Sequence, residues 1–170
     1  YVVDSSKVKV YPQPTPILEV PKKFCEDSLV QFKNKSVGTL GSLWDFGDGS
    51  TSALKDPLHA FQKPGKYMVK LTVYADTTGC PATDSSLIEI AERPVAAFSH
   101  IPDACVPASV QMTNQSTGAD YYAWTFGNGD VSSVPDPTVA YKKDGTFQIC
   151  LVAYDNEGCH SDPVCSPIII

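Results

Sequence analysis

The chain of 170 residues has little positive charge and no long apolar run. It carries 13 lysines and arginines against 19 aspartates and glutamates, which gives a formal net charge of −6 and a pI of about 4.9. Nucleic-acid-binding proteins present a basic stripe, and anionic membrane surfaces attract basic segments. No apolar run approaches the ~20 residues that span a bilayer. We therefore expect neither a nucleic-acid partner nor direct membrane insertion.

Catalytic and metal-binding signatures are also missing. The sequence has no Gly-x-Ser-x-Gly elbow, no His-Glu-x-x-His and no phosphate-cradling loop. Its three histidines, His59, His100 and His160, fall at unrelated positions, and its six cysteines form no Cys-x-x-Cys pair. We expect no catalytic residues, no cofactor and no metal centre. The cysteines are better explained by disulfides formed in an oxidising compartment.

What the chain does contain is an internal repeat. Residues 44–49, Trp-Asp-Phe-Gly-Asp-Gly, recur at 124–129 as Trp-Thr-Phe-Gly-Asn-Gly, an offset of 124 − 44 = 80. Trp and Phe two residues apart lie on the same face of a strand, so each copy buries an aromatic pair. The two glycines allow the chain to reverse at once. The predicted structural residues are Trp44, Phe46, Gly47, Gly49, Trp124, Phe126, Gly127 and Gly129.

Strands elsewhere are predicted by alternation, because no helical period of useful length occurs. One face of a later strand should hold Tyr67, Val69, Leu71 and Val73, and its counterpart in the second copy should hold Phe147, Ile149, Leu151 and Ala153. Each copy is just large enough for one sandwich core. The fold class predicted from these patterns is all-β, with two tandem sandwiches and no substantial helix.

The motifs of the first copy resemble a PKD domain, an immunoglobulin-like β-sandwich module. They are Trp44-Asp45-Phe46-Gly47-Asp48-Gly49-Ser50, Asp56-Pro57, Phe61 and Gly65-Lys66-Tyr67. The second copy matches at Trp124, Phe126-Gly127-Asn128-Gly129, Asp136-Pro137, Tyr141 and Gly145, but has Thr125 and Asn128 where the family usually carries aspartates. The resemblance covers nearly the whole chain. It implies two Ig-like sandwiches that serve as spacer, adhesin or binding accessory.

The repeat also predicts the domain limits. Residues 1–11 are expected to be the last strand of a preceding repeat or an N-terminal extension. Residues 12–93 are expected to form the first sandwich, with a core from about residue 24, and residues 94–170 the second. Prolines between these segments should interrupt strand pairing.

Three disulfides are inferred from the repeat and from strand parity, among 15 possible pairings. Corresponding cysteines should bond within their own domains, and two extra cysteines lie on the outward faces of neighbouring strands, close enough for a bridge. The predicted bonds are Cys25–Cys80, Cys105–Cys159 and Cys150–Cys165.

Four further residues are weak candidates for binding. Asp45 and Asp48 could hold Ca²⁺, but their spacing departs from a calcium loop and the second copy replaces both, so capping of the turn is favoured. Tyr74 and Tyr154 project outward from equivalent strands and could stack a sugar ring. The alternative is that a tyrosine hydroxyl bonds back to the edge of the sandwich.

Two Asn-x-Ser sequons, Asn34-Lys35-Ser36 and Asn114-Gln115-Ser116, also recur at the offset of 80. Their recurrence is better explained by Asn and Ser closing a turn than by glycosylation.

The expected function is structural and adhesive. The cysteine-bearing repeat resembles those of surface adhesins of gliding bacteria, which implies a non-catalytic module of a long secreted or cell-surface protein, acting in attachment or gliding-type motility. The alternative is an accessory substrate- or carbohydrate-binding module of a secreted polysaccharidase or protease. Expected partners are neighbouring copies of the repeat in cis, and a surface polysaccharide or another cell-surface protein. The expected location is extracellular, at the cell surface.

Overall fold

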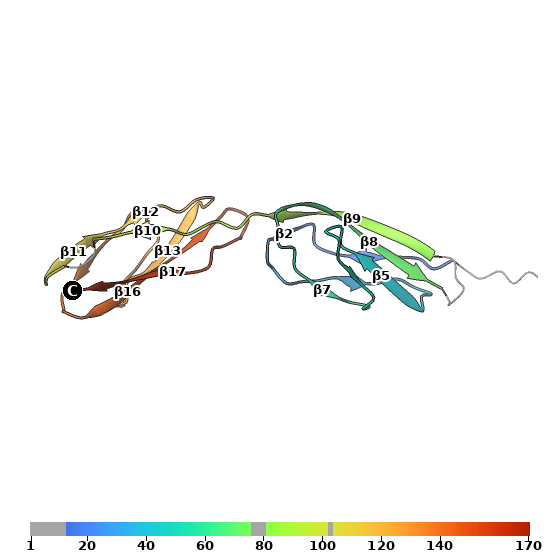
Figure 1. The fold of residues 1–170 in the computed structure, drawn as a ribbon, viewed down its shortest axis with the longest axis horizontal. Coiled ribbons are helices and arrows are strands. Elements are labelled where there is room, and N and C mark those ends of the chain that lie inside the picture. The colour runs from blue at the N-terminus through green and yellow to red at the C-terminus, as the bar shows by residue number, and fades with distance from the viewer. Residues whose placement is uncertain (1–12, 76–80, 102–103) are drawn as a thin grey trace, which may run out of the picture. The chain divides into compact units, whose positions relative to one another are not determined.

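The computed structural model describes residues 13–75, 81–101 and 104–170 (Figure 1). Contacts within the chain divide it into two units between Ala91 and Glu92. All regular elements in the described ranges are β-strands, which confirms the all-β prediction. Accordingly, this part of the chain contains no helix capable of crossing a membrane. The predicted strand at 1–11 lies outside the described residues.

The first domain has one large sheet and two short strand pairs. The five-stranded sheet has the order β2 (Lys23–Cys25), β9 (Pro81–Ala91), β8 (Gly65–Tyr74), β5 (Gly41–Asp45) and β6 (Thr51–Ser52), with β2 parallel to β9 and the other pairs antiparallel. The short pairs are β1 (Leu18–Glu19) with β4 (Lys33–Asn34), and β3 (Val30–Gln31) with β7 (Leu58–His59).

The second domain repeats this plan with four strands in its larger sheet. Their order is β14 (Val131–Ser132), β13 (Tyr121–Thr125), β16 (Thr146–Tyr154) and β17 (Val164–Ile169), all antiparallel. The short pairs are β10 (Phe98–Ser99) with β12 (Thr113–Asn114), and β11 (Ala108–Gln111) with β15 (Thr138–Tyr141).

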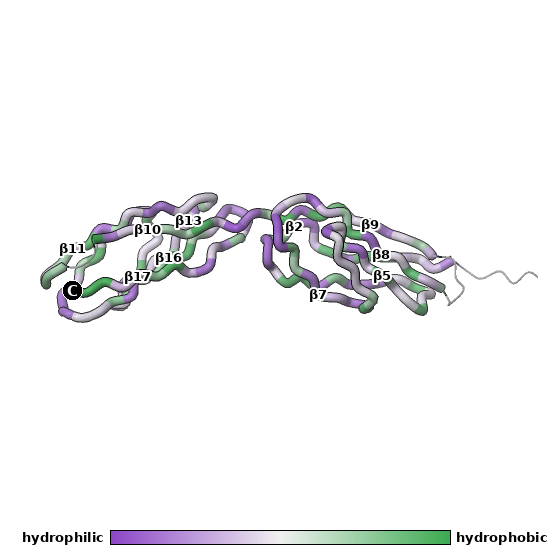
Figure 2. The backbone as a smooth tube through the Cα atoms, viewed as in Figure 1, coloured by the Kyte–Doolittle hydropathy of each residue, from purple (hydrophilic) through white to green (hydrophobic). Residues whose placement is uncertain are grey.

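Each domain encloses one core between its larger sheet and its short pairs. Trp44 and Trp124 are 0% and 1% exposed and are packed among the inward residues of β8 and β16, as alternation predicts. Figure 2 shows hydrophobic stretches along β16 and β17. The first core also takes in Leu18 and Val20, which precede the expected start of the core at about residue 24.

Steric constraints require glycine at one position of each glycine turn. Gly47 and Gly127 have φ of 79° and 76°, a region that residues with a Cβ adopt only with strain. A Cβ on Gly47 would stand 2.8 Å from the Met68 carbonyl oxygen, and one on Gly127 would stand 2.7 Å from the Gln148 nitrogen. Both glycines therefore let the turn lie against the neighbouring long strand.

Candidate functional site

The two carboxylates of the first glycine turn accept hydrogen bonds from the backbone. Asp45 Oδ1 accepts the Gly47 N–H at 2.9 Å, and Asp48 Oδ1 accepts the Ser50 N–H at 2.9 Å and the Ser50 hydroxyl at 2.6 Å. These bonds are what turn capping requires. They support the capping interpretation over a calcium site. Across the described residues, no group of three or more His, Cys, Asp or Glu side chains is placed to hold a metal ion.

His59 joins this turn from β7, which belongs to the opposite layer. Its Nε2 donates to Asp48 Oδ2 at 2.7 Å, and its ring stacks on Phe46 with centroids 4.0 Å apart. Partial burial would raise the pKa of Asp48, but the hydrogen bonds from Ser50 and His59 outweigh it and lower that pKa below 3.8. The pair therefore ties the two layers of the first domain together.

The combination of Ser50, His59 and Asp48 is not a catalytic triad. A triad uses different ring nitrogens for the carboxylate and the hydroxyl. Here the same Nε2 lies 2.7 Å from Asp48 Oδ2 and 3.3 Å from Ser50 Oγ, and that hydroxyl donates to Asp48 instead. A shallow recess of about 530 Å³ lies beside the cluster and also contacts Lys63 and Tyr67.

The second glycine turn is capped by an amide instead of a carboxylate. Asn128 Oδ1 accepts the Asp130 N–H at 3.0 Å, and its Nδ2 donates to Asp130 Oδ2 at 2.9 Å. Thr125 makes no side-chain hydrogen bond within the described residues, so only Asn128 keeps the predicted capping role. Val139, buried in the core, stands at the position of His59.

The other two histidines have separate local partners. His100 contacts the Ile101 carbonyl through Nδ1 and the Ser166 hydroxyl through Nε2 at 3.0 Å. His160 donates from Nδ1 to the Ser161 carbonyl at 3.0 Å. The structure therefore does not bring the histidines together into one site.

Both sequons close turns, as predicted. Asn34 Oδ1 accepts the Ser36 N–H at 2.9 Å, and Asn114 Oδ1 accepts the Ser116 N–H at 2.9 Å. Asn34 is only 6% exposed, which places it poorly for glycan attachment.

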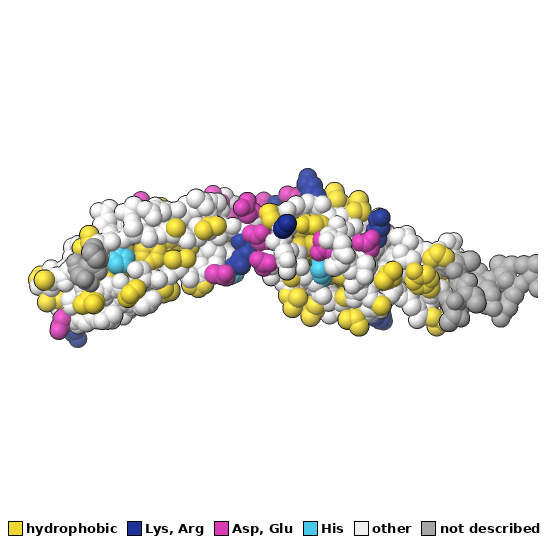
Figure 3. Space-filling model, viewed as in Figure 1, with side chains coloured by type: hydrophobic (Ala, Val, Ile, Leu, Met, Phe, Trp, Pro, Cys, Tyr) yellow, Lys and Arg dark blue, Asp and Glu magenta, His cyan; other side chains and the backbone are white. Residues whose placement is uncertain are grey.

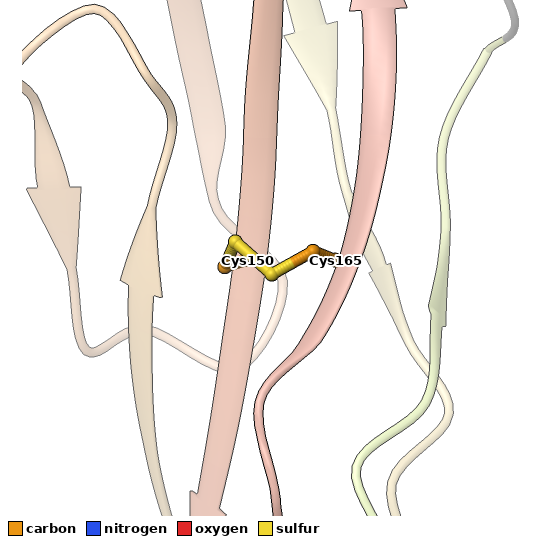
Figure 4. The surroundings of a disulfide bond; sticks show 2 residues. All are labelled: Cys150 and Cys165. Carbon is orange, nitrogen blue, oxygen red and sulfur yellow. A yellow bond between two sulfur atoms is a disulfide. The ribbon is translucent and has the colours of Figure 1, made fainter.

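Of the predicted disulfides, Cys150–Cys165 is confirmed. The two cysteines are direct cross-strand partners on β16 and β17, with Cα atoms 4.1 Å apart (Figure 4). Cys165 is exposed and Cys150 half-buried, as outward parity predicts. The bond joins the edge strand β17 to the centre of its sheet.

The predicted Cys105–Cys159 bond is wrong. Cys105 is a free, exposed thiol, whereas Cys159 is disulfide-bonded and buried. Ala104 donates to the Ile169 carbonyl, beside the start of β16, while Cys159 accepts a bond from Asp155, just beyond the end of β16. At ~3.3 Å per residue the strand separates these ends by roughly 25 Å, which no disulfide can span.

The predicted Cys25–Cys80 bond involves Cys80, which lies outside the described residues. Cys25 is disulfide-bonded, and its register partner is Ala91, at the end of β9 opposite Pro81. The repeat offset identified corresponding cysteines, but it does not identify bonded ones.

The outward tyrosines differ between the domains. Tyr154 lies directly opposite Tyr121, whereas Tyr74 lies opposite Gly41. Neither Tyr74 nor Tyr154 uses its hydroxyl in a hydrogen bond within the described residues. The sequence signal for this difference is residue identity at one position of the repeat, Gly41 against Tyr121.

Charged side chains of both signs occur on the surface. On the face seen in Figure 3, lysine and arginine side chains are scattered among aspartates and glutamates. A dispersed pattern of both signs is typical of a solvated surface, in keeping with the net charge of −6.

The structure thus consists of two tandem Ig-like β-sandwiches in which the polar groups of the glycine turns bond within their own turn or domain. The chain matches the PKD domain family over residues 12–90 and again over residues 102–164. The chain belongs to the PKD domain family, with two copies in tandem. PKD domains are generally non-catalytic accessory modules.

Two similar proteins are bacterial collagenases. The chain is 29% identical to collagenase ColA of Bacillus cereus over 75 residues, which cover 44% of this chain and 8% of that protein. It is 46% identical to a microbial collagenase of Vibrio alginolyticus over 48 residues, covering 28% of this chain and 6% of that protein. The chain thus matches only a small part of each relative's length.

Among solved structures, the PKD1 domain of the Vibrio cholerae metalloprotease PrtV is similar to this chain. The two are 30% identical with a TM-score of 0.40, and the match covers 46% of this chain and 96% of that domain. The PKD1 domain of Vibrio anguillarum Epp is 28% identical, also with a TM-score of 0.40, covering 46% of this chain and 93% of that domain.

Proposed function

We propose that the chain is a non-catalytic accessory module of a secreted hydrolase, which holds a macromolecular substrate near a catalytic domain encoded elsewhere in the parent protein. The observation that carries this proposal is the sequence similarity to two bacterial collagenases, 46% over 48 residues in one case. The similarity favours the accessory role over the adhesin role that the cysteine-bearing repeat suggested.

The polar groups of the domains support a role without catalysis. In the first glycine turn, Asp45, Asp48 and His59 satisfy the backbone and one another. Groups held in such bonds are less available to abstract or donate protons during a reaction. The disulfides favour an oxidising, extracellular location.

Sedimentation with insoluble substrates tests this function. The purified chain is mixed with collagen fibres, cellulose or chitin, and the bound and free fractions are measured together with any soluble products. We expect retention on at least one substrate without release of peptides or sugars. Absence of retention on all three substrates, or hydrolysis by the chain alone, would contradict the proposal.

A second candidate is an adhesive or structural stalk at the cell surface, including a role in gliding-type motility. The 80-residue repeat within this chain favours it, because stalks and adhesins are built from consecutive copies of one module. Neighbouring copies in cis and surface polysaccharides or proteins would be its partners. The parent gene decides between the candidates: a long array of this unit supports the stalk, and one adjacent hydrolase domain supports the accessory role.

A further inference from the structure

The described tyrosines fall into two groups by what their hydroxyls do. Three donate to backbone carbonyls: Tyr67 to Lys63 at 2.9 Å, Tyr122 to Ala119 at 3.4 Å and Tyr141 to Phe126 at 3.0 Å. Tyr74, Tyr121 and Tyr154 make no such bond within the described part of the chain, and the exposed fractions of Tyr121 and Tyr154 are 59% and 36%. A buried tyrosine usually finds a hydrogen-bond partner for its hydroxyl. These three hydroxyls are not held in that way.

Strand register places two of the three unbonded tyrosines, Tyr121 and Tyr154, side by side. Tyr121 on β13 is the direct cross-strand partner of Tyr154 on β16. Direct partners have Cβ atoms within roughly 5.5 Å and share a face of the sheet. The adjacent residue Ala153 is buried, so Tyr154 and Tyr121 face outward from the second domain.

His160 extends this pair into a row across the sheet. It forms an antiparallel bridge with Tyr154 on the side away from Tyr121, and the rings of His160 and Tyr154 lie 5.8 Å apart. Its Nδ1 donates to the Ser161 carbonyl, so Nε2 is the nitrogen open to a ligand. We call Tyr121, Tyr154 and His160 the aromatic row.

Polar groups border the aromatic row. Asp120 precedes Tyr121, donates its N–H to the Tyr154 carbonyl at 2.8 Å and accepts the Asn156 N–H on Oδ2 at 3.0 Å. Asp120 and Asn156 are both exposed. A carboxylate and an amide therefore adjoin the aromatic row in the chain, one residue before Tyr121 and two residues after Tyr154. A pyranose matches this surface, because its C–H face packs on aromatic rings while its hydroxyls bond to such groups.

We propose that the aromatic row is a binding site for a neutral polysaccharide, with Tyr121 and Tyr154 packing on sugar rings and Asp120, Asn156 and His160 bonding to hydroxyls. A neutral glycan fits better than an anionic one because a carboxylate borders the rings. The proposal names a substrate class for the accessory role above and rests on that role.

The first domain supplies a natural control for this site. The same row across its larger sheet runs Gly41, Tyr74 and Pro81. It contains one aromatic ring instead of three. The site therefore belongs to the second domain alone, and Tyr74 is a matched tyrosine outside it.

Affinity electrophoresis with soluble polysaccharides tests the proposal. The chain is run in gels containing hydroxyethylcellulose, glycol chitin, xylan or laminarin, and retardation gives the apparent Kd. We expect retardation by at least one of them, and a loss of affinity of about tenfold or more in Tyr121→Ala and in Tyr154→Ala. Tyr121→Phe keeps the ring and should retain most of the affinity. Tyr74→Ala should leave it unchanged.

Thermal unfolding of each variant checks that the second domain is still folded. If none of the four polysaccharides retards the chain, or if Tyr74→Ala weakens binding as much as Tyr121→Ala, the proposal is overturned. Retention on collagen fibres without polysaccharide binding would reject the site and leave the accessory role standing. Loss of collagen retention in Tyr121→Ala, again without polysaccharide binding, would show that the row contacts protein and not sugar.

Discussion

The two glycine turns have the same backbone but differ in which residue caps the turn and what that residue contacts. In the first domain Asp48 is bonded to a histidine from the other layer, and in the second Asn128 and the buried Val139 stand at these positions. Gly47 and Gly127 keep nearly the same φ in both. The comparison teaches that both copies keep the aromatic residues and the glycines, whereas the capping residue and its partner differ: Asp48 with His59 in the first turn, and Asn128 with Asp130 in the second.

The two domains also differ at corresponding positions of their larger sheets. One row of cross-strand partners runs Asp45, Lys70 and Ser85 in the first domain, and Thr125, Cys150 and Cys165 in the second. The acidic and basic partners Asp45 and Lys70 of the first domain correspond to Thr125 and Cys150. The covalent bond of the second domain joins Cys150 to Cys165, where the first domain has Lys70 opposite Ser85.

The largest effects should come from the shared core. Trp44→Ala should destabilise the first domain by about 3–5 kcal/mol, because it empties the centre of a close-packed core. The second domain should be nearly unaffected, since distant sites act independently. The chain has two tryptophans, so Trp124 fluorescence in this variant follows the second domain while circular dichroism follows both. Equal destabilisation of the two domains would contradict the separation into two cores.

Removing the disulfide should have a somewhat smaller effect, confined to the second domain. Cys150→Ser with Cys165→Ser opens a loop of 15 residues, which should cost about 3 kcal/mol. Denaturant unfolding of the double variant measures this. The matched control is Lys70→Ser in the first domain, where Ser85 already stands opposite, and it should change stability by well under about 1 kcal/mol. A larger loss of stability in the control would show that this row of cross-strand partners contributes to stability even where it has no disulfide.

Lowering the pH should destabilise the first domain by a still smaller amount, through Asp48. The pKa of Asp48 is lowered in the folded state, so its contribution to stability is present above its unfolded pKa of 3.8 and is lost as pH falls through the folded value. The stability difference between wild type and Asp48→Asn should therefore be constant above about pH 5 and vanish at lower pH. Melting curves across this range give the difference directly. Asn128→Ala in the second domain should show no such pH dependence.

At neutral pH the Asp48→Asn change itself should cost under about 1 kcal/mol, since Asn and Asp cap comparably. Asn can still accept the Ser50 N–H. A cost of several kcal/mol would show that the bond to His59 carries more of the domain's stability than the cap does.

Much of the fold could be predicted because it follows from period and repetition. Alternation predicted that Val69, Leu71 and Val73 lie in the core, and the repeat predicted the same for the corresponding residues of β16. Cys150 and Cys165 were predicted by the same parity. What these signals have in common is that each depends on spacing along the chain or on correspondence between copies.

The remainder depended on which strands meet and in what register. His59 contacts Asp48 across the two layers, a contact that no local spacing encodes. The pairing of Tyr121 with Tyr154 is fixed by the connection between β13 and β16. The Cys105–Cys159 prediction failed for the same reason, because strand direction places these residues at opposite ends of β16.

The central claim is that the carboxylates of the first glycine turn hold the backbone and not a cation. Thermal unfolding of the chain in excess CaCl₂ and in EDTA tests it most directly. A ligand that does not bind the native state adds no stability. The account therefore predicts that the Tm of the first domain is the same in CaCl₂ as in EDTA, both for the wild type and for Asp48→Asn. A Tm that rises with Ca²⁺ in the wild type, and no longer rises in Asp48→Asn, would contradict it and identify the turn as a calcium site.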